Sequence, residues 1–437
     1  MDGAQYYQSV IDRLRNCFQH SGYCIATGEE LAGESRDPVF PSVAAPVDQL
    51  ERFTLERGLE VHVPVIGKDS RSVLMPLDIE IFMAGDQHRL YTDREEQKEY
   101  FERTLPVLHF VEDMFRSRGM PYLLDYTPSG GHILFQNVLG YRATEEVRRI
   151  GFVEEDLAAA CEYVEPGDLR RARPTSLEAA QVFSGLGRIA EYTALLAMRA
   201  FQDHEGLGLP PLTISDSQDM CINLDNTWSE GPPYWRAIRS PFSLHKKNRE
   251  KYGNRHQPPL VDVAGALFDG REATEVRDLD RILDCMWDLD HAAEHAGSFS
   301  GFIPCSNESL ADFVAEYRAS DLYSFHRDFD AEQDLARGSA VEQAKREDTI
   351  SDRTRAVLHF PNPLALQPRE LVGFVHDFLI HAQWHPRHIA NILRDLYQNP
   401  EHNWVQDFFR HPAEEKANFW ARTYSAVALF KSGRIHV

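Results

Sequence analysis

The most informative segment of the chain reads Pro76-Leu77-Asp78-Ile79-Glu80-Ile81-Phe82. Apolar and acidic residues alternate in it, so in a β-strand Asp78 and Glu80 point to one face and the apolar side chains to the other. Two like charges on one face repel each other, and each carboxylate resists losing its hydration shell. A bound cation would relieve both costs, and hard divalent ions such as Mg²⁺ prefer carboxylate oxygens. The pattern therefore predicts either a divalent metal site or an edge strand with a solvated acidic face.

The length and charge of the chain limit the classes to which it can belong. Its 437 residues are enough for two or three domains, each with its own core. No apolar run approaches the length of about 18 residues that indicates a membrane span, and the N-terminus lacks the basic flank and apolar run of a signal peptide. A net charge of −22 argues against a general nucleic-acid-coating protein. We expect a cytoplasmic protein without a membrane partner.

Six cysteines are scattered along the chain without a C-x-x-C pair, at positions 17, 24, 161, 221, 285 and 305. This usage is typical of reduced thiols in a cytoplasmic protein. Cys17, His20 and Cys24 could contribute to a metal knuckle, but their spacing is unusual and a fourth ligand is not apparent. Free thiols are the favoured interpretation.

The periodicity of apolar residues predicts a mixed α and β core. We expect a strand hairpin from residues 60–66 and 72–82, a helix over 95–118 that Pro106 kinks or divides, and a second hairpin from 120–126 and 133–136. A helix over 175–202 opens with a capping-box pattern from Thr175 to Glu178, and short strands follow at 212–214 and 220–225. These elements place the core at residues 56–262.

The regions outside the core are predicted to be helical or irregular. Residues 1–55 read as an N-terminal helix followed by loop, because prolines interrupt any longer element. Residues 263–350 read as an acidic helical region that ends in a charge-rich linker at 320–350. Residues 351–437 read as a separate helical C-terminal domain. Four of its histidines, at positions 376, 381, 385 and 388, lack a zincin arrangement, which favours structural or nucleic-acid-contacting roles over metal binding.

A second polar motif, Ser129-Gly130-Gly131-His132, lies at the turn of the second hairpin. The glycines allow a ligand to approach the backbone closely, where free N–H groups hold phosphate oxygens. A half-buried structural role for His132 is the alternative.

Two further features lie near residue 230. Asp225 ends an apolar strand, where it would supply a third metal carboxylate or merely cap the following turn. From Arg236 to Arg255 the chain carries seven Lys and Arg residues against the single acid Glu250. Such a cluster in an acidic chain predicts an anionic partner, with a solvated loop as the alternative.

The order of these signals resembles the archaeo-eukaryotic primase superfamily, which comprises the catalytic cores of primases and primase-polymerases. That family has an acidic pair, a small-x-His motif and a single Asp, and in archaeal small subunits a segment R-x-P-x-S-L-H-x-K follows. The matching segment here is Arg239-Ser240-Pro241-Phe242-Ser243-Leu244-His245-Lys246-Lys247. The resemblance covers roughly residues 55–260.

The resemblance implies an α+β fold, a core of mixed sheets with flanking helices, here followed by a helical C-terminal module. It implies a DNA-dependent primase-polymerase that makes or extends short primers on a single-stranded DNA template from nucleoside triphosphates, working with a helicase or another replication or repair protein. The implied ligands of Mg²⁺ or Mn²⁺ are Asp78, Glu80 and Asp225. The implied nucleotide-binding residues are Ser129, Gly130, Gly131, His132, Arg239, Ser243, His245 and Lys247.

The chain departs from the family pattern at three points. The acidic pair is D-x-E, not D-x-D, and no cysteine cluster lies between the second and third motifs, which puts zinc-dependent help in primer initiation in doubt. Asp225 lies farther from Arg239 than in the family, and Asp216 or Asp219 could take its place. Two other functions stay open: a catalytically inactive scaffold that binds nucleotide or single-stranded nucleic acid, and a metal-dependent nuclease or rolling-circle initiator, although the His-hydrophobic-His pair of such initiators is not found.

Overall fold

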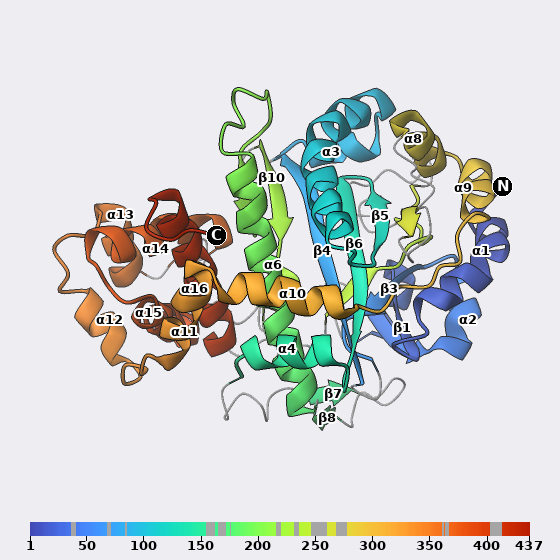
Figure 1. Cartoon of the computed structure of the whole chain (residues 1–437). Coiled ribbons are helices and arrows are strands. Elements are labelled where there is room, and N and C mark those ends of the chain that lie inside the picture. Colours follow the sequence, from blue (N-terminus) through green and yellow to red (C-terminus); the bar gives the residue numbers. More distant parts are fainter. Residues whose placement is uncertain are drawn as a thin grey trace.

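The chain is described by a computed structural model, shown as a cartoon in Figure 1. The described residues are 1–35, 41–67, 71–83, 85–153, 176–215, 220–230, 236–245, 260–265, 278–360, 362, 367–402 and 413–437, with the backbone alone at 162–164, 172–174 and 266–267.

A six-stranded sheet forms the centre of the molecule, with strand order β12-β5-β6-β4-β10-β9. All neighbouring strands are antiparallel except β10 and β9, which are parallel. The strand bounds are β4 Ser72–Met83, β5 Leu123–Thr127, β6 Gly130–Val138, β9 Leu212–Ile214, β10 Met220–Asp225 and β12 Val263–Leu267. The predicted acidic strand is thus the long β4, which lies in the interior of the sheet, so the edge-strand interpretation of residues 76–82 is wrong.

Two long helices, α3 (Arg94–Ser117) and α6 (Leu177–Ala200), both contact β4 and cover one face of this sheet (Figure 1). Leu77 and Ile79 line a small internal void together with Val111 of α3 and Ala190 of α6. The apolar half of the alternating pattern therefore packs against helices, and the face that carries Asp78 and Glu80 points away from them. Pro106 lies inside α3, which continues through it without a break.

The predicted pairing of residues 60–66 with 72–82 is wrong. β3 (Glu60–Pro64) belongs to a separate four-stranded sheet with order β11-β3-β1-β2, whose other strands are β1 Tyr23–Thr27, β2 Ser42–Pro46 and β11 Ala237–Arg239. The two predicted hairpin partners meet only near the turn, at a bridge between Ile66 and Val73 and a hydrogen bond from Leu74 N to Val65 O. The loop predicted after the first helix thus contains β1 and β2. Tyr23, Ile25 and Thr27 of β1 are strand-favouring residues, a signal that the prediction of a loop overlooked, and β1 pairs with β2 on one side and with β3 on the other.

The remaining elements before residue 278 flank these sheets. The helices are α1 Gly3–Cys17, α2 Leu50–Thr54 and α4 Arg142–Ile150, and β7 (Glu162–Val164) pairs with β8 (Ala172–Pro174). Short 3-10 helices lie at Glu29–Leu31, Val47–Gln49, Gln87–Tyr91, Thr227–Ser229 and Pro400–His402. Ser176 caps α6 through the Ala179 N–H, whereas the predicted cap Thr175 lies outside the described residues.

The C-terminal part is helical, as predicted. Its helices are α8 Leu279–Trp287, α9 Leu289–Ala296, α10 Glu308–Arg318, α11 Asp321–Ala331, α12 Ser339–Ala344, α13 Asp352–His359, α14 Pro368–His376, α15 Pro386–Gln398 and α16 Ala413–Lys431, with a π-helical turn at Asp377–His381. A second hydrophobic cluster is built from residues between Phe329 and Tyr424. These observations confirm an α+β architecture with a helical C-terminal region, and the exact domain boundaries stay predictions.

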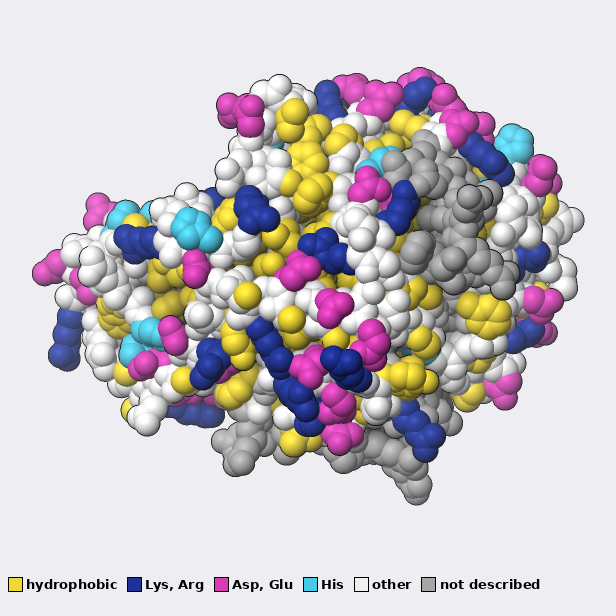
Figure 2. Space-filling model, in the orientation of Figure 1, with side chains coloured by type: hydrophobic (Ala, Val, Ile, Leu, Met, Phe, Trp, Pro, Cys, Tyr) yellow, Lys and Arg dark blue, Asp and Glu magenta, His cyan; other side chains and the backbone are white. Residues whose placement is uncertain are grey.

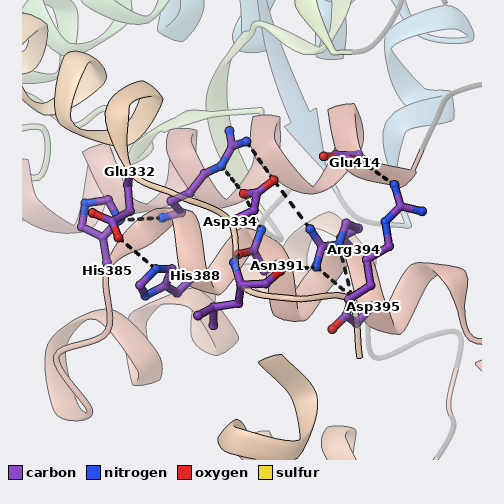
Figure 3. A network of polar contacts seen from close by, with 11 residues as sticks. Glu332, Asp334, His385, His388, Asn391, Arg394, Asp395 and Glu414 are labelled. Carbon is purple, nitrogen blue, oxygen red and sulfur yellow. Dashed lines mark hydrogen bonds and ion pairs between the residues drawn. The ribbon is translucent and has the colours of Figure 1, made fainter. Parts of the chain in front are cut away.

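The predicted linker at 320–350 is instead folded into α11 and α12, and the loop between these helices makes polar contacts with α15. Asp334 accepts hydrogen bonds from Arg387 Nε (2.6 Å) and Asn391 Nδ2 (2.8 Å), and Arg394 lies 3.7 Å away (Figure 3). The charges that resemble a linker in the sequence are therefore paired with basic residues of α15. Sequence composition does not reveal such partners because they lie more than 50 residues along the chain.

The C-terminal helices dock on the six-stranded sheet on the side opposite the four-stranded sheet (Figure 1). Glu191 of α6 is buried and accepts hydrogen bonds from Arg422 Nη2 (2.6 Å) and Thr423 Oγ1 (2.8 Å) of α16, while His326 Nε2 of α11 lies 2.7 Å from its other oxygen. Trp420 Nε1 also donates to Glu230 (2.7 Å), close to the end of β10. The helical region is thus attached to the core by a buried polar network.

The surface charge is unevenly distributed. Figure 2 shows acidic side chains gathered along the upper edge, over α3 and α8, and basic side chains mixed with acidic ones over the lower half. Among the helices of the described residues, none is long and apolar enough to cross a membrane.

Candidate active site on the six-stranded sheet

Four polar residues lie in one row across four neighbouring strands of the six-stranded sheet. Asp225 of β10 is opposite Asp78 of β4, which is opposite His132 of β6, which is opposite Asp125 of β5. Directly paired residues point to the same face with Cβ atoms about 4.5–5.5 Å apart. The strand register therefore brings together representatives of all three predicted motifs, although they are up to 147 positions apart in the sequence (225 − 78).

The carboxylates of this row are poorly solvated and repel one another. Burial raises the pKa of Asp78 well above its usual range, and the neighbouring charges of Glu80 and Asp225 raise it further. The Asp78 side chain is 21% exposed, so it still reaches a surface from which an ion could enter. A cation bound next to these carboxylates would stabilise their ionised form.

Asp225 is held by the turn that follows β10. Burial raises its pKa, while hydrogen bonds from Thr227 N (2.8 Å) and Thr227 Oγ1 (3.0 Å) act in the opposite direction. Ser215 Oγ lies 3.4 Å from the same carboxylate. Asp225 therefore caps the turn, as the alternative interpretation expected, and also lies opposite Asp78. Asp216 and Asp219 lie outside the described residues.

His132 is fully enclosed, with 4% of its surface exposed, so the expectation of a half-buried histidine is wrong. Its Nδ1 lies 3.2 Å from Asp125 Oδ2, and its Nε2 lies 3.7 Å from Asp78 Oδ1. Burial lowers the pKa of His132 to about 4, so the ring is neutral near pH 7. The ring thus connects the partly exposed carboxylate of Asp78 to the buried carboxylate of Asp125.

Asp125 and Asp262 are site residues that the motif analysis missed. Together with His132 they form a buried group whose candidate ligand atoms lie within 4.8 Å of one another. Burial raises the pKa of both carboxyl groups well above the usual range. Asp125 had a usable signal: a hairpin that turns at Pro128-Ser129 pairs residue 125 with residue 132. Asp262 had no such signal, because it lies about 130 residues along the chain from His132 and belongs to none of the predicted motifs.

Ser129 and the two glycines line the end of the β5–β6 hairpin. Ser129 Oγ donates to Glu80 Oε2 (3.3 Å), so the second acid of the pair is joined to the predicted nucleotide motif. A Cβ atom on Gly130 would lie 1.9 Å from Ile79 O, and one on Gly131 would lie 2.9 Å from the Leu108 side chain. Close packing of β6 against the β4 backbone therefore requires Gly130, whereas at Gly131 the Leu108 side chain of α3 would have to shift.

The predicted phosphate-binding segment starts beside the row of carboxylates. Arg239, on β11, donates from Nε to Glu60 Oε1 (2.6 Å), and its Nη1 lies 3.5 Å from Asp262. Burial opposes its charge, but these two carboxylates raise its pKa above the usual range. The positive charge of Arg239 partly opposes the rise in the pKa of Asp78 and of Asp125. Arg239 of β11 therefore lies close to the carboxylate row.

The rest of that segment is only partly described. Ser243 is fully buried, and its Oγ accepts the Val61 N–H (3.0 Å), which is a structural contact. His245 is 4% exposed, and its ring packs 5.2 Å from the ring of Tyr91. Lys247 lies outside the described residues.

The three predicted metal ligands share a face without converging to coordination distance. In the described part of the chain, two groups of three His, Cys, Asp or Glu ligand atoms lie within 4.8 Å of one another: Asp125-His132-Asp262 and His376-Asp377-His381. Asp78, Glu80 and Asp225 are not such a group. Cys17, His20 and Cys24 are not one either, and burial raises the pKa of both thiols to about 12, which disfavours thiolate ligands.

Comparison with known proteins does not identify a family for this chain. The chain matches no family model and no curated protein. Among solved structures it is similar to a chain described as "Polymerase Domain from Mycobacterium tuberculosis Ligase D in complex with DNA", with a TM-score of 0.32 and 11% sequence identity over 72% of this chain and 88% of that one. A TM-score at this level carries no argument, so the function is inferred from the site itself.

Proposed function

We propose that this protein is a DNA-dependent primase-polymerase, which synthesises or extends short primers on a single-stranded DNA template by metal-dependent nucleotidyl transfer. The observation that carries the proposal is the row formed by Asp225, Asp78 and His132 on adjacent strands. The order of the motifs along the chain supports the same activity, because it resembles that of primase-polymerases.

The donor set fits a pair of hard divalent cations. Asp78, Glu80 and Asp225 offer oxygen ligands only, the type that Mg²⁺ and Mn²⁺ prefer. Their mutual repulsion, visible in the raised pKa of Asp78, would be relieved by an ion between them. When bound, such ions lower the pKa of the attacking hydroxyl and stabilise the charge on the leaving pyrophosphate.

The chain's own residues would bind and orient the nucleotide. Ser129 and His132 are within reach of Glu80 and Asp78, respectively, so both side chains border the proposed metal ligands. We propose that Arg239, His245 and Lys247 approach the phosphates from the other side. Neutralising charge that builds on those oxygens contributes to catalysis without a covalent intermediate.

The test is strand synthesis on single-stranded DNA with Mg²⁺ or Mn²⁺, with and without a primer, and with ribonucleotides and deoxyribonucleotides supplied separately. Wild-type protein should incorporate nucleotides, and both Asp78→Ala and His245→Ala should abolish incorporation. Products that require a primer would identify an extending polymerase that depends on another initiator. Absence of synthesis under every condition, with nucleotide still bound, would contradict the proposal.

One observation favours the alternative of an inactive binding scaffold. Arg239 is already engaged by Glu60 and Asp262, and Ser243 is buried in backbone contacts, so two of the predicted nucleotide contacts are occupied within the protein. A scaffold would bind nucleotide or single-stranded DNA equally well in wild-type and Asp78→Ala protein. It would also show no incorporation in either.

A further inference from the structure

A second cluster of candidate metal ligands lies far from the carboxylate row, in the C-terminal helices. α14 ends at His376, and the chain continues through Asp377–His381 as one π-helical turn. In an α-helix, residues five apart point about 140° away from each other, because each residue turns the chain by about 100°. A π-turn brings residues five apart closer to the same side of the helix, and such turns occur frequently at functional sites.

The π-turn brings three side chains of suitable type together. The candidate ligand atoms of His376, Asp377 and His381 lie within 4.8 Å of one another. His381 Nδ1 is 3.3 Å from Asp377 Oδ1, and the rings of His376 and His381 have centroids 5.3 Å apart. Two imidazoles and one carboxylate bind Zn²⁺ and similar ions in many proteins, at about 2.0–2.2 Å from each atom. Small side-chain rotations would close the cluster to that distance.

The carboxylate at the centre of this cluster is fixed by its surroundings. Its Oδ2 atom accepts hydrogen bonds from Ser351 N (3.2 Å), Ser351 Oγ and Thr354 Oγ1, all at the start of α13. These contacts occupy Oδ2, and Oδ1 is the oxygen that lies toward His381. Hydrogen bonds of this kind orient metal-binding carboxylates and are needed for full affinity.

The cluster is accessible from solvent. Asp377 is buried, whereas His376 is exposed and the His381 side chain is 50% exposed. His376 also borders a cavity of about 280 Å³ between α14, α16 and β9. A cation could therefore enter and keep water in its remaining coordination positions.

The other two histidines of this region provide a contrast (Figure 3). His385 caps α15 by accepting the Arg387 N–H through Nδ1 (3.2 Å), and His388 Nε2 lies 3.1 Å from Glu332. Their positions are thus explained by contacts within the protein. His376, His381 and Asp377 instead contact one another, so three potential ligands gather at one point.

We propose that His376, Asp377 and His381 form a binding site for one divalent transition-metal ion of the Zn²⁺ type, separate from the catalytic site. This site would join the end of α14 to the following turn and, through Asp377, to α13. It uses nitrogen ligands, so Mg²⁺ would not fill it. For His376 and His381, this proposal takes the place of the structural or nucleic-acid-contacting role expected from the sequence.

The test is a titration of the full chain with Co²⁺ in excess Mg²⁺, which keeps the carboxylate row occupied by a hard ion. Visible absorption of Co²⁺ reports nitrogen coordination. Wild-type protein and the control His388→Gln should bind one Co²⁺ per chain with equal affinity, and His376→Gln and His381→Gln should each weaken binding at least tenfold. Added Zn²⁺ should displace the Co²⁺ and raise the thermal unfolding temperature of the wild-type protein and of His388→Gln, but not that of His376→Gln or His381→Gln.

A supporting variant is Thr354→Val, which removes one hydrogen bond to Asp377 and should weaken Co²⁺ binding about 10–100-fold. Both histidines are exposed, so their glutamine variants should retain the wild-type circular dichroism spectrum. Equal Co²⁺ affinity in wild type, His376→Gln and His381→Gln would overturn the proposal, as would an equal loss in the His388→Gln control. None of these outcomes depends on polymerase activity.

Discussion

At the scale of single residues, Asp78 illustrates how a functional group can destabilise the fold that holds it. Its raised pKa means that the folded protein binds a proton that the unfolded chain releases. Stability therefore falls as the pH rises above the unfolded Asp value of about 4. The same electrostatic cost that would favour a bound cation beside Asp78 weakens the metal-free protein.

Replacing Asp78 by the isosteric Asn removes this charge, so we expect Asp78→Asn to stabilise the metal-free protein at pH 7 by on the order of 1 kcal/mol. The advantage should shrink as the pH falls toward about 4, where the native Asp is protonated. Urea unfolding in a chelating buffer at several pH values measures the difference in the free energy of unfolding between Asp78→Asn and wild type. A variant that is less stable than wild type at pH 7 would contradict this account.

The exposed Asp312 of α10 provides a matched control, since Asp312→Asn makes the same chemical change on the surface. It should leave stability within about 0.5 kcal/mol of wild type at every pH. Added Mn²⁺ should stabilise wild type and Asp312→Asn but not Asp78→Asn.

Sequence reasoning found the residues of the site that belong to recognisable motifs and missed those that support them. The prediction that Asp78, His132 and Asp225 share a site comes from the order of their motifs along the chain, which resembles that of the primase superfamily. Glu60 and Asp262 were missed because their partner, Arg239, comes from a strand whose neighbours the sequence does not reveal. Buried ion pairs between distant segments have no local pattern.

At the scale of elements, the β5–β6 hairpin depends on two glycines. A Cβ at Gly130 would meet the Ile79 carbonyl oxygen at 1.9 Å, so β6 must move away from β4 to admit it. Gly130→Ala should lower the free energy of unfolding by about 1–3 kcal/mol, as overpacking usually does.

The control for this substitution is Gly373→Ala in α14, where no atom lies within 4 Å of the new Cβ. Alanine is the better helix former, so this variant should be more stable by up to about 1 kcal/mol. Chemical denaturation compares the three proteins. Equal stability of Gly130→Ala and wild type would show that the packing argument is wrong.

Local patterns predicted the elements that are long or self-contained. The helix α3 and the β5–β6 hairpin follow from periodicity and turn residues alone. The strands β1 and β2 and the helices α11 and α12 do not follow in this way: β1 pairs with β2 and β3, and the loop between α11 and α12 contacts α15. The pairing of β3 failed for the same reason: its true neighbours, β1 and β11, are separated from each other by about 210 residues.

At the scale of the whole molecule, Glu191 joins the central helix α6 to α16 and α11. Burial disfavours its charge, but Arg422 and His326 lower its pKa below the usual range. The stabilising contribution of Glu191 is therefore present above the unfolded Glu value of about 4.3 and is lost as the pH falls.

Glu191→Leu leaves the partly buried Arg422 without its carboxylate partner and should destabilise the protein by about 3–5 kcal/mol at neutral pH. Urea unfolding at pH 7 measures this loss, and Glu316→Leu, which removes an exposed ion pair with Arg118, should cost less than about 1 kcal/mol. Similar losses in the two variants would mean that the Glu191 network does not hold the helical region to the core.

The central claim is that the row of carboxylates on the six-stranded sheet carries out nucleotidyl transfer. The most direct test measures Mn²⁺-dependent nucleotide incorporation on a primed single-stranded DNA template by wild type, Asp78→Asn, Asp225→Asn and Asp312→Asn. We predict that both strand variants lose at least about a hundredfold in rate while retaining their circular dichroism spectra, and that Asp312→Asn keeps wild-type activity. Undiminished incorporation by Asp78→Asn, or its absence in the wild-type protein, would contradict the claim.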